Sequence, residues 1–198
     1  MKNEFRKICL SNKKINRYLI SKKLGLEIYK LAKKYKRILI FIPLKNEPDI
    51  RWVINKLRRE KKEIFVPFMQ DLSFKMVKYT LPLKKKKFSI LEPLNKNKTL
   101  AKIDLAIVPI VGMDSSFRRV GFGKGMYDRF FANLKYKPKI VFVQLVPCIS
   151  KDIVTDEFDI KADEYLSFKL RSKNGDNRIN SRYYYLASGG IFYSKENR

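Results

Sequence analysis

A short glycine-rich segment holds most of the residues in this sequence that could do chemistry. Three of the eight glycines lie within five residues, in Arg119-Val-Gly-Phe-Gly-Lys-Gly-Met-Tyr-Asp128. Glycines at alternate positions let the backbone approach a ligand closely, and free amide groups at the start of a helix form an anion site. Arg119 and Lys124 add cations suited to phosphate oxygens, and Asp128 offers a carboxylate to a magnesium ion. The segment predicts a phosphate-binding loop, with a simple strand-to-helix turn as the alternative.

Several other kinds of site are excluded by spacing and composition. The glycines do not follow G-x-G-x-x-G with a later acidic residue for ribose, and no Ser or Thr follows Lys124, as a P-loop requires. The sequence has no histidine, which excludes Ser-His-Asp and Cys-His nucleophiles and any zinc site that needs an imidazole. Two cysteines, Cys9 and Cys148, are too few for a disulfide framework and indicate a reducing compartment.

The chain is strongly basic, with 45 Lys and Arg against 19 Asp and Glu and a net charge of +26. Such a charge can bind nucleic acid because neutralised phosphates release counterions. The lysines are spread along the whole chain, however, without a helix-turn-helix, an aromatic RNA-binding strand or a zinc knuckle. We therefore expect no specific nucleic-acid partner, but a positive field that concentrates polyanions such as nucleotide triphosphates. No apolar run reaches the roughly 18 residues of a membrane span, so we expect a cytoplasmic protein with no membrane partner.

The elements that must position the loop alternate between helix and strand. The apolar spacing predicts helices over 4–34, 49–61 and 124–134, buried strands over 37–43, 64–67, 103–109 and 140–145, and an edge strand over 74–79. We expect residues 1–168 to form an α/β fold, a single three-layer αβα domain with a largely parallel, mixed central sheet. Lys84–Lys87 is expected to be a solvated loop, and residues 169–198 a tail that is either an added strand or disordered.

The glycine segment and its flanks resemble the signature of the 5-formyltetrahydrofolate cyclo-ligase family, also called methenyltetrahydrofolate synthetases. The resemblance rests on Val108-Pro-Ile-Val-Gly-Met-Asp114 and on residues 119–129. Other matching pieces follow in the family's order, from Lys2 to about Ser167: Lys2-Asn-Glu-Phe-Arg6, Pro43-Leu-Lys-Asn-Glu-Pro-Asp49, Ile90-Leu-Glu-Pro93 and Glu157-Phe-Asp-Ile-Lys-Ala-Asp163.

The resemblance implies roles for individual residues. It implies ATP contacts from Lys2, Asn3, Glu4, Phe5, Arg6, Arg119, Val120, Gly121, Phe122, Gly123, Lys124, Gly125, Met126 and Tyr127. It implies substrate contacts from Ile42, Glu47, Phe122, Gly123, Lys124, Gly125 and Met126, and Mg²⁺ ligands at Asp128 and Asp163. Lys124 and Arg119 would be catalytic. Simpler interpretations are a surface cation for Arg6, a helix N-terminal acid for Glu47 and a turn residue for Asp163.

Three positions depart from the family's usual pattern. Met126 stands where many members have a tyrosine, Phe158 where many have a histidine, and Ile50 where threonine is frequent. None of these changes removes a cation or a predicted metal ligand. Met126 nevertheless leaves an alternative, namely a family relative that binds folate or ATP but has lost turnover.

The resemblance implies a reaction that needs neither a histidine nor a cysteine nucleophile. That reaction is the ATP- and Mg²⁺-dependent cyclisation of 5-formyltetrahydrofolate to 5,10-methenyltetrahydrofolate. Nothing in the sequence demands more than a monomer. The alternative is a basic RNA- or nucleotide-binding protein without catalysis.

Overall fold

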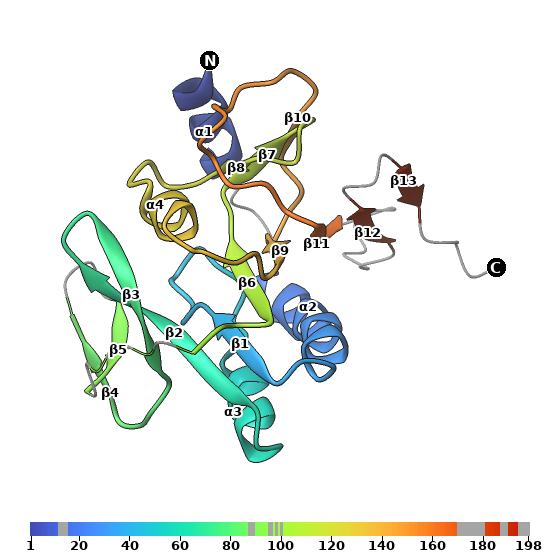
Figure 1. Cartoon of the computed structure of the whole chain (residues 1–198). Coiled ribbons are helices and arrows are strands. Elements are labelled where there is room, and N and C mark those ends of the chain that lie inside the picture. The colour runs from blue at the N-terminus through green and yellow to red at the C-terminus, as the bar shows by residue number, and fades with distance from the viewer. Residues whose placement is uncertain are drawn as a thin grey trace.

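The computed structural model describes residues 1–11, 16–86, 90–94, 97, 99, 101–169, 181–186 and 190–193. In this part of the chain, eight strands form one mixed sheet in the order β13-β12-β11-β9-β6-β1-β2-β3 (Figure 1). The strands are β1 (Arg37–Ile40), β2 (Glu63–Gln70), β3 (Ser73–Lys78), β6 (Leu105–Pro109), β9 (Lys139–Val143), β11 (Glu164–Lys169), β12 (Ser181–Leu186) and β13 (Gly190–Tyr193). The central run from β2 through β1, β6 and β9 to β11 is parallel. The outer strands β3, β12 and β13 pair antiparallel.

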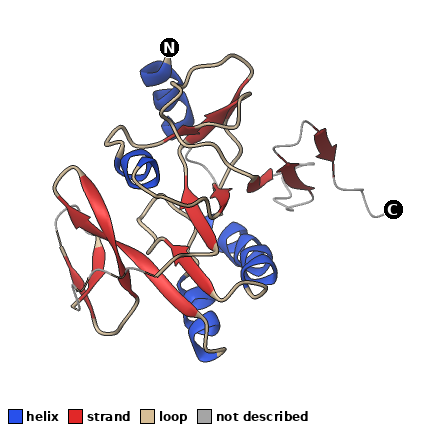
Figure 2. Ribbon diagram, in the orientation of Figure 1, coloured by secondary structure: helices blue, strands red, loops and turns tan. Residues whose placement is uncertain are grey.

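Helices cover both faces of this sheet (Figure 2). The described helices are α1 (Lys2–Ser11), α2 (Arg17–Ala32), α3 (Arg51–Arg59) and α4 (Met126–Ala132), of which α1 lies beside Gly112 rather than on this sheet. Successive strand residues point to opposite faces, so Ile38 and Ile40 of β1 pack in one core with α2 and α3. Leu39, between them, packs in a second core that includes Phe130 of α4. The three-layer αβα prediction is thus confirmed.

Two small sheets complete the described fold. One contains β10 (Ile149–Ser150), β7 (Gly112–Asp114) and β8 (Arg119–Val120), and the other pairs β4 (Leu83–Lys85) with β5 (Leu91–Pro93). The predicted solvated loop at Lys84–Lys87 is therefore wrong for its first two residues, because β4 pairs antiparallel with β5. Lys86 follows the strand, and Lys87 lies outside the described residues.

The predicted tail contains β12 and β13, which add to the sheet beside β11. Residues 170–180, 187–189 and 194–198 lie outside the described residues, as do residues 12–15 within the predicted first helix. That helix is found as two helices, α1 and α2. None of the described helices is long and apolar enough to cross a bilayer.

A disulfide joins Cys9 of α1 to Cys148, which precedes β10, with the Cα atoms 5.6 Å apart. The cysteine count predicted a reducing compartment and no disulfide framework. A count cannot show that α1 packs against this loop, because the two residues are separated by 139 positions. This bond fastens the N-terminal helix to the body of the protein.

Candidate active site

The glycine segment forms a loop between β8 and α4 whose shape depends on glycine. Gly123 has φ of 95° and Gly125, the N-cap of α4, has φ of 59°, a region that residues with a Cβ rarely adopt. Gly121 packs so close to the guanidinium of Arg119 that a Cβ there would overlap it. The three glycines therefore allow both the turn and the close approach of Arg119.

A cavity of about 420 Å³ opens beside this loop. Five cationic side chains and two carboxylates line it, so its wall carries an excess of positive charge that suits an anionic ligand. The lining residues are Lys2, Arg6, Arg119, Gly121, Gly123, Lys124, Gly125, Asp128, Arg129, Ala132, Phe158 and Asp159.

Helix α1 brings two of its cations to the cavity. The Nε of Arg6 donates a hydrogen bond to the carbonyl oxygen of Gly121 at 2.7 Å. The Lys2 ammonium pairs with Asp156 at 2.9 Å and also with Asp159. Burial lowers the pKa of Lys2, but hydrogen bonds and charges from the two carboxylates outweigh it and raise the pKa overall. Both cations are thus held in place by residues far along the chain.

The other predicted ATP residues of α1 do not line the cavity. Asn3 accepts a hydrogen bond from Arg6, and Glu4 pairs with the amino group of Met1 at 3.0 Å. Phe5 packs beside Gly112, since a Cβ on that glycine would lie 2.8 Å from the Phe5 ring. These three residues support the helix rather than the cavity wall.

Arg119 and Asp128 form a buried ion pair under the loop. Arg119 is only 6% exposed, and its Nη1 lies 3.3 Å from Oδ2 of Asp128. Its Nε donates to the carbonyl oxygen of Pro109 at 3.2 Å, and its guanidinium lies 5.0 Å from the centre of the Tyr127 ring. The other Asp128 oxygen accepts from the backbone N–H of Ile160 at 3.3 Å. The pair fixes the start of α4 against the loop before β11.

Glu47 is a buried carboxyl group in the segment after β1. Its Oε2 accepts a hydrogen bond from the backbone N–H of Leu44 at 2.9 Å. Burial raises the pKa of Glu47 to about 7, against the opposing effects of that hydrogen bond and of the charges on Arg119 and Arg17. Burial and the charge of Glu47 raise the pKa of Tyr127. Glu47, Arg119 and Tyr127 therefore influence one another electrostatically, and a buried carboxyl that titrates near neutrality marks a candidate functional residue.

Comparison of the chain with known proteins identifies its family. Residues 6–166 match the 5-formyltetrahydrofolate cyclo-ligase family. The chain belongs to this family. It is 29% identical to the 5-formyltetrahydrofolate cyclo-ligase of Mus musculus over 147 residues, which is 66% of this chain and 72% of the mouse protein. It is 26% identical to the enzyme of the same name from Haemophilus influenzae over 134 residues, covering 63% and 72% of the two chains.

A solved structure shares the fold of this family member. The 5,10-methenyltetrahydrofolate synthetase of Aquifex aeolicus superposes with a TM-score of 0.70 at 26% identity, over 84% of this chain and 89% of that one. The family expected from the glycine segment is thus confirmed, and the α/β fold with it.

The two metal ligands that the cyclo-ligase resemblance implies are held by different parts of the fold. Asp163 does not line the cavity, and its Oδ2 accepts from the backbone N–H of Ile140 at 2.8 Å, at the start of β9. Among the described residues, no three His, Cys, Asp or Glu side chains gather into a site that could hold a metal ion by themselves. Mg²⁺ commonly uses one or two carboxylates together with substrate phosphates. The carboxylates that line the cavity are those of Asp128 and Asp159.

The remaining predicted residues surround the loop in different ways. Ile42 is buried in the core with α2 and α3, and Val120 is also buried. Phe122 is 42% exposed at the tip of the loop. Met126 packs against the core on the α4 side, and its carbonyl oxygen accepts from Ser73 at 3.3 Å.

Sequence reasoning assigned no role to four cavity residues, Arg129, Ala132, Phe158 and Asp159. The Nε of Arg129 donates to the carbonyl oxygen of Leu72 at 2.7 Å, and its Nη2 contacts the carbonyl oxygen of Lys124. Arg129 therefore ties the glycine loop to the turn between β2 and β3. Asp159 and Phe158 belong to the acidic stretch matched to the family, but their type alone does not show that they face the loop.

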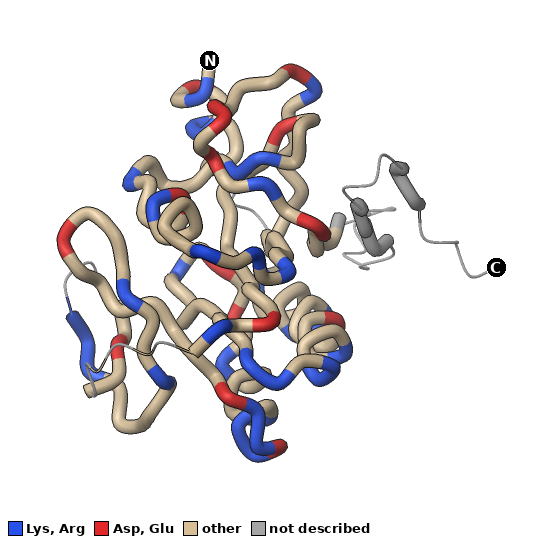
Figure 3. The backbone as a smooth tube through the Cα atoms, viewed as in Figure 1, with Lys and Arg blue, Asp and Glu red and all other residues tan. Residues whose placement is uncertain are grey.

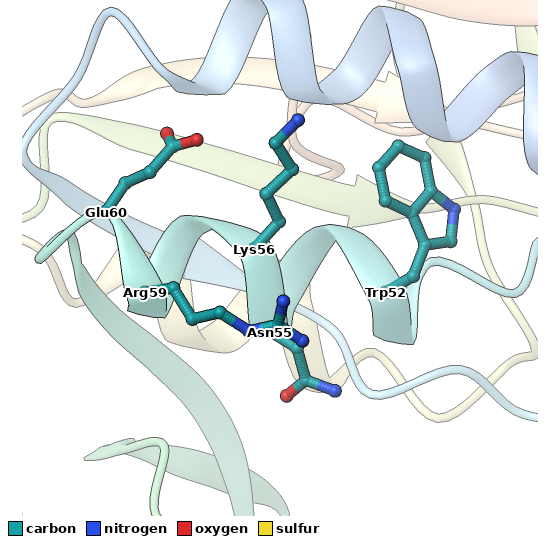
Figure 4. Close-up of a pocket in the computed structure, with 5 residues that line it drawn as sticks. All are labelled: Trp52, Asn55, Lys56, Arg59 and Glu60. Carbon is teal, nitrogen blue, oxygen red and sulfur yellow. The ribbon is translucent and has the colours of Figure 1, made fainter.

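A larger hollow, of about 560 Å³, lies along α3 (Figure 4). It is lined by Trp52, Asn55, Lys56, Arg59 and Glu60. The Lys56 ammonium lies 4.2 Å from the centre of the Tyr29 ring, and the Tyr29 hydroxyl donates to Glu60 at 2.5 Å. All its lining residues come from one helix and its C-cap, and it has two cations and one carboxylate where the cavity at β8 has five and two. The glycine-loop cavity is therefore the better candidate active site of this cyclo-ligase family member.

Proposed function

We propose that this protein is an ATP- and Mg²⁺-dependent 5-formyltetrahydrofolate cyclo-ligase. The observation that carries the proposal is the cavity at the glycine loop, where five cations from α1, β8, the loop and α4 converge in a chain of the cyclo-ligase family. An excess of cations around free loop amides suits a polyphosphate. The proposed products are 5,10-methenyltetrahydrofolate, ADP and phosphate.

In the proposed reaction, the formyl oxygen of the substrate attacks the γ-phosphate of ATP and ADP leaves. The N10 nitrogen then bonds to the formyl carbon and releases its proton. The C–O bond breaks, phosphate departs and the ring is closed. The chain's contribution is to hold the two substrates together and to neutralise charge on the transferred phosphoryl group. Lys124 does this from the loop and Arg119 from β8, with Lys2 and Arg6 supporting the phosphates from α1.

The carboxylates on the cavity wall fit a magnesium ion that arrives with the nucleotide. When bound, Mg²⁺ would neutralise phosphate charge, and the residue proposed to hold it is Asp128, which lines the cavity. Only the family resemblance supports Asp163 as a second ligand, because its carboxylate accepts a hydrogen bond from the backbone of β9. We further expect the enzyme to act in the cytoplasm as a monomer, with no specific nucleic-acid partner.

The experiment that tests this function is a near-ultraviolet assay. Purified protein is mixed with 5-formyltetrahydrofolate and Mg·ATP, and the absorbance of methenyltetrahydrofolate, which the substrate lacks, is followed. A rise that requires both ATP and Mg²⁺ is expected. A folded protein that binds ATP but gives no rise would overturn the proposal and favour a binding protein without catalysis. Met126→Tyr would then show whether this departure from the family's pattern caused the loss.

A further inference from the structure

Phe158 is an exposed aromatic side chain on the wall of the glycine-loop cavity. It lies in the segment between β10 and β11, is 71% exposed, and lines the cavity with Lys2, Arg6 and Lys124. Isolated exposed apolar side chains are common and need no explanation on their own. An open ring that borders a ligand cavity is different, because a flat apolar face there is available to a ligand.

The rest of the cavity wall consists mainly of charged side chains and of the backbone of the glycine loop. Among the described residues that line it, Phe158 is the only aromatic and Ala132 the only other apolar side chain besides the glycines. The Lys2 ammonium lies 5.4 Å from the centre of the Phe158 ring. The cationic part of the cavity and the aromatic ring are therefore neighbours, joined by Lys2.

A nucleoside triphosphate presents the same two chemistries at its two ends. Its phosphates require cations and amides, and its base requires a flat face on which to stack, since stacking on aromatic side chains stabilises bound bases. The glycine loop with Lys124 and Arg6 provides the first, and Phe158 provides the second. Within the described lining of the cavity, no other side chain offers a ring to the base.

We propose that Phe158 is the stacking platform for the adenine base of the nucleotide bound in this cavity. This inference rests on the proposed use of ATP and adds the subsite for the base. The phosphates then lie toward Lys124 and the glycine amides, with Lys2 between the two subsites. Because Phe158 is mostly exposed, replacing it should not disturb the core.

The test separates base binding from phosphate binding by calorimetry. Mg·ADP and Mg·tripolyphosphate are titrated into the intact wild-type protein, Phe158→Ala and Phe158→Tyr. Ile153→Ala is the matched control, because Ile153 is 66% exposed in the same segment and does not line the cavity. Phe158→Ala should weaken Mg·ADP binding about tenfold and leave Mg·tripolyphosphate binding unchanged. Phe158→Tyr and Ile153→Ala should bind both as the wild type does.

Three results would overturn the inference, the third of them from titrating 5-formyltetrahydrofolate into the same variants. Unchanged Mg·ADP affinity in Phe158→Ala, or an equal loss for both ligands, would show that the ring does not hold the base. A loss of 5-formyltetrahydrofolate binding with Mg·ADP unaffected would assign the ring to the other substrate. The near-ultraviolet assay on the wild type reports separately on the proposed function, so a failure of the subsite and a failure of the activity are distinguishable.

Discussion

Lys124 and Arg119 are the two cations of the glycine loop, and they differ in their partners. Arg119 is buried against Asp128, whereas no carboxylate in the described part of the chain pairs with the exposed Lys124. A cation on the cavity wall without a carboxylate partner can interact with a phosphoryl group without first breaking an ion pair. We expect Lys124→Ala to lower kcat/KM by about 10²-fold or more, the loss typical of one preorganised charge contact. Steady-state assays check this, with the exposed Lys137→Ala as the control of equal charge change, and near wild-type turnover in Lys124→Ala would refute the role.

Glu47 should make the stability of the protein depend on pH. Its pKa is raised from 4.5 to about 7 by burial. Below pH 4.5 the carboxyl is neutral in both folded and unfolded chains. As the pH rises to 7 the unfolded chain loses the proton first, so the folded state becomes less stable by about 3 kcal/mol at ~1.4 kcal/mol per pH unit. Glu47→Gln removes this cost, so its gain in free energy of unfolding over the wild type should grow by that amount from pH 4 to pH 8. Urea denaturation at both pH values measures it, and a constant difference would contradict the burial argument.

The residue types alone predicted the glycine loop but not all the residues that line the cavity beside it. Arg119, Lys124 and Asp128 were found because glycines, cations and a carboxylate lie within ten positions of one another. Asp159 and Phe158 were missed because their approach to the loop depends on how the segment before β11 folds back over α4. Asp163 shows the converse, since its place in a matching motif does not reveal its bond to Ile140.

Helix α1 carries cavity cations although it has no buried residue of its own. Polar contacts join α1 to the rest of the protein besides the disulfide from Cys9 to Cys148. Lys2 pairs with Asp156 and Asp159, and Arg6 donates a hydrogen bond to Gly121. The disulfide should therefore hold the helix where these contacts form. It also closes a long loop in the unfolded chain, which lowers the entropy of that state.

We expect Cys148→Ser to lose about 2–4 kcal/mol of unfolding free energy and to bind Mg·ADP about tenfold more weakly, because Lys2 and Arg6 are no longer preorganised. Thermal unfolding and calorimetry check the two effects. Dithiothreitol should reproduce both in the wild type and add nothing in the variant. Unchanged affinity in the reduced protein would show that the ion pairs alone position α1.

At the scale of elements, the sequence predicted the strands that carry long apolar runs, although β2 continues past Pro67 to Gln70. The apolar runs that end in Pro43, Pro67 and Pro109 correspond to β1, β2 and β6, because strands covered on both faces need apolar residues at successive positions. β4 was missed because its lysines are exposed, so that half of its surface resembles a loop. The order of the strands was also beyond reach, since pairing between β1 and β6 joins segments separated by α3 and by the four strands β2 to β5.

For the molecule as a whole, the charge of +26 is distributed rather than confined to the site. Lys and Arg recur along the described chain from α1 to β9, with fewer acidic positions between them (Figure 3). Such a field attracts any polyanion. Added salt weakens the attraction, because the electrostatic screening length falls from about 10 Å at 0.1 M ionic strength to about 3 Å at 1 M. The cavity adds its own excess of cations at short range, where salt screens less.

The distributed surface charge and the cavity cations should differ in their sensitivity to salt, and this difference predicts how the protein treats its proposed folate substrate. A polyglutamate tail adds negative charges outside the reacting ring system, so the distributed field should favour it over the monoglutamate at low salt. We expect the ratio of kcat/KM for the pentaglutamate to that for the monoglutamate to be about tenfold at 50 mM salt and to approach one at 0.5 M. Lys124→Ala should lower both rates and leave the ratio unchanged, because that residue acts on the phosphoryl group. A ratio that persists at high salt would instead locate a specific tail-binding site on the surface.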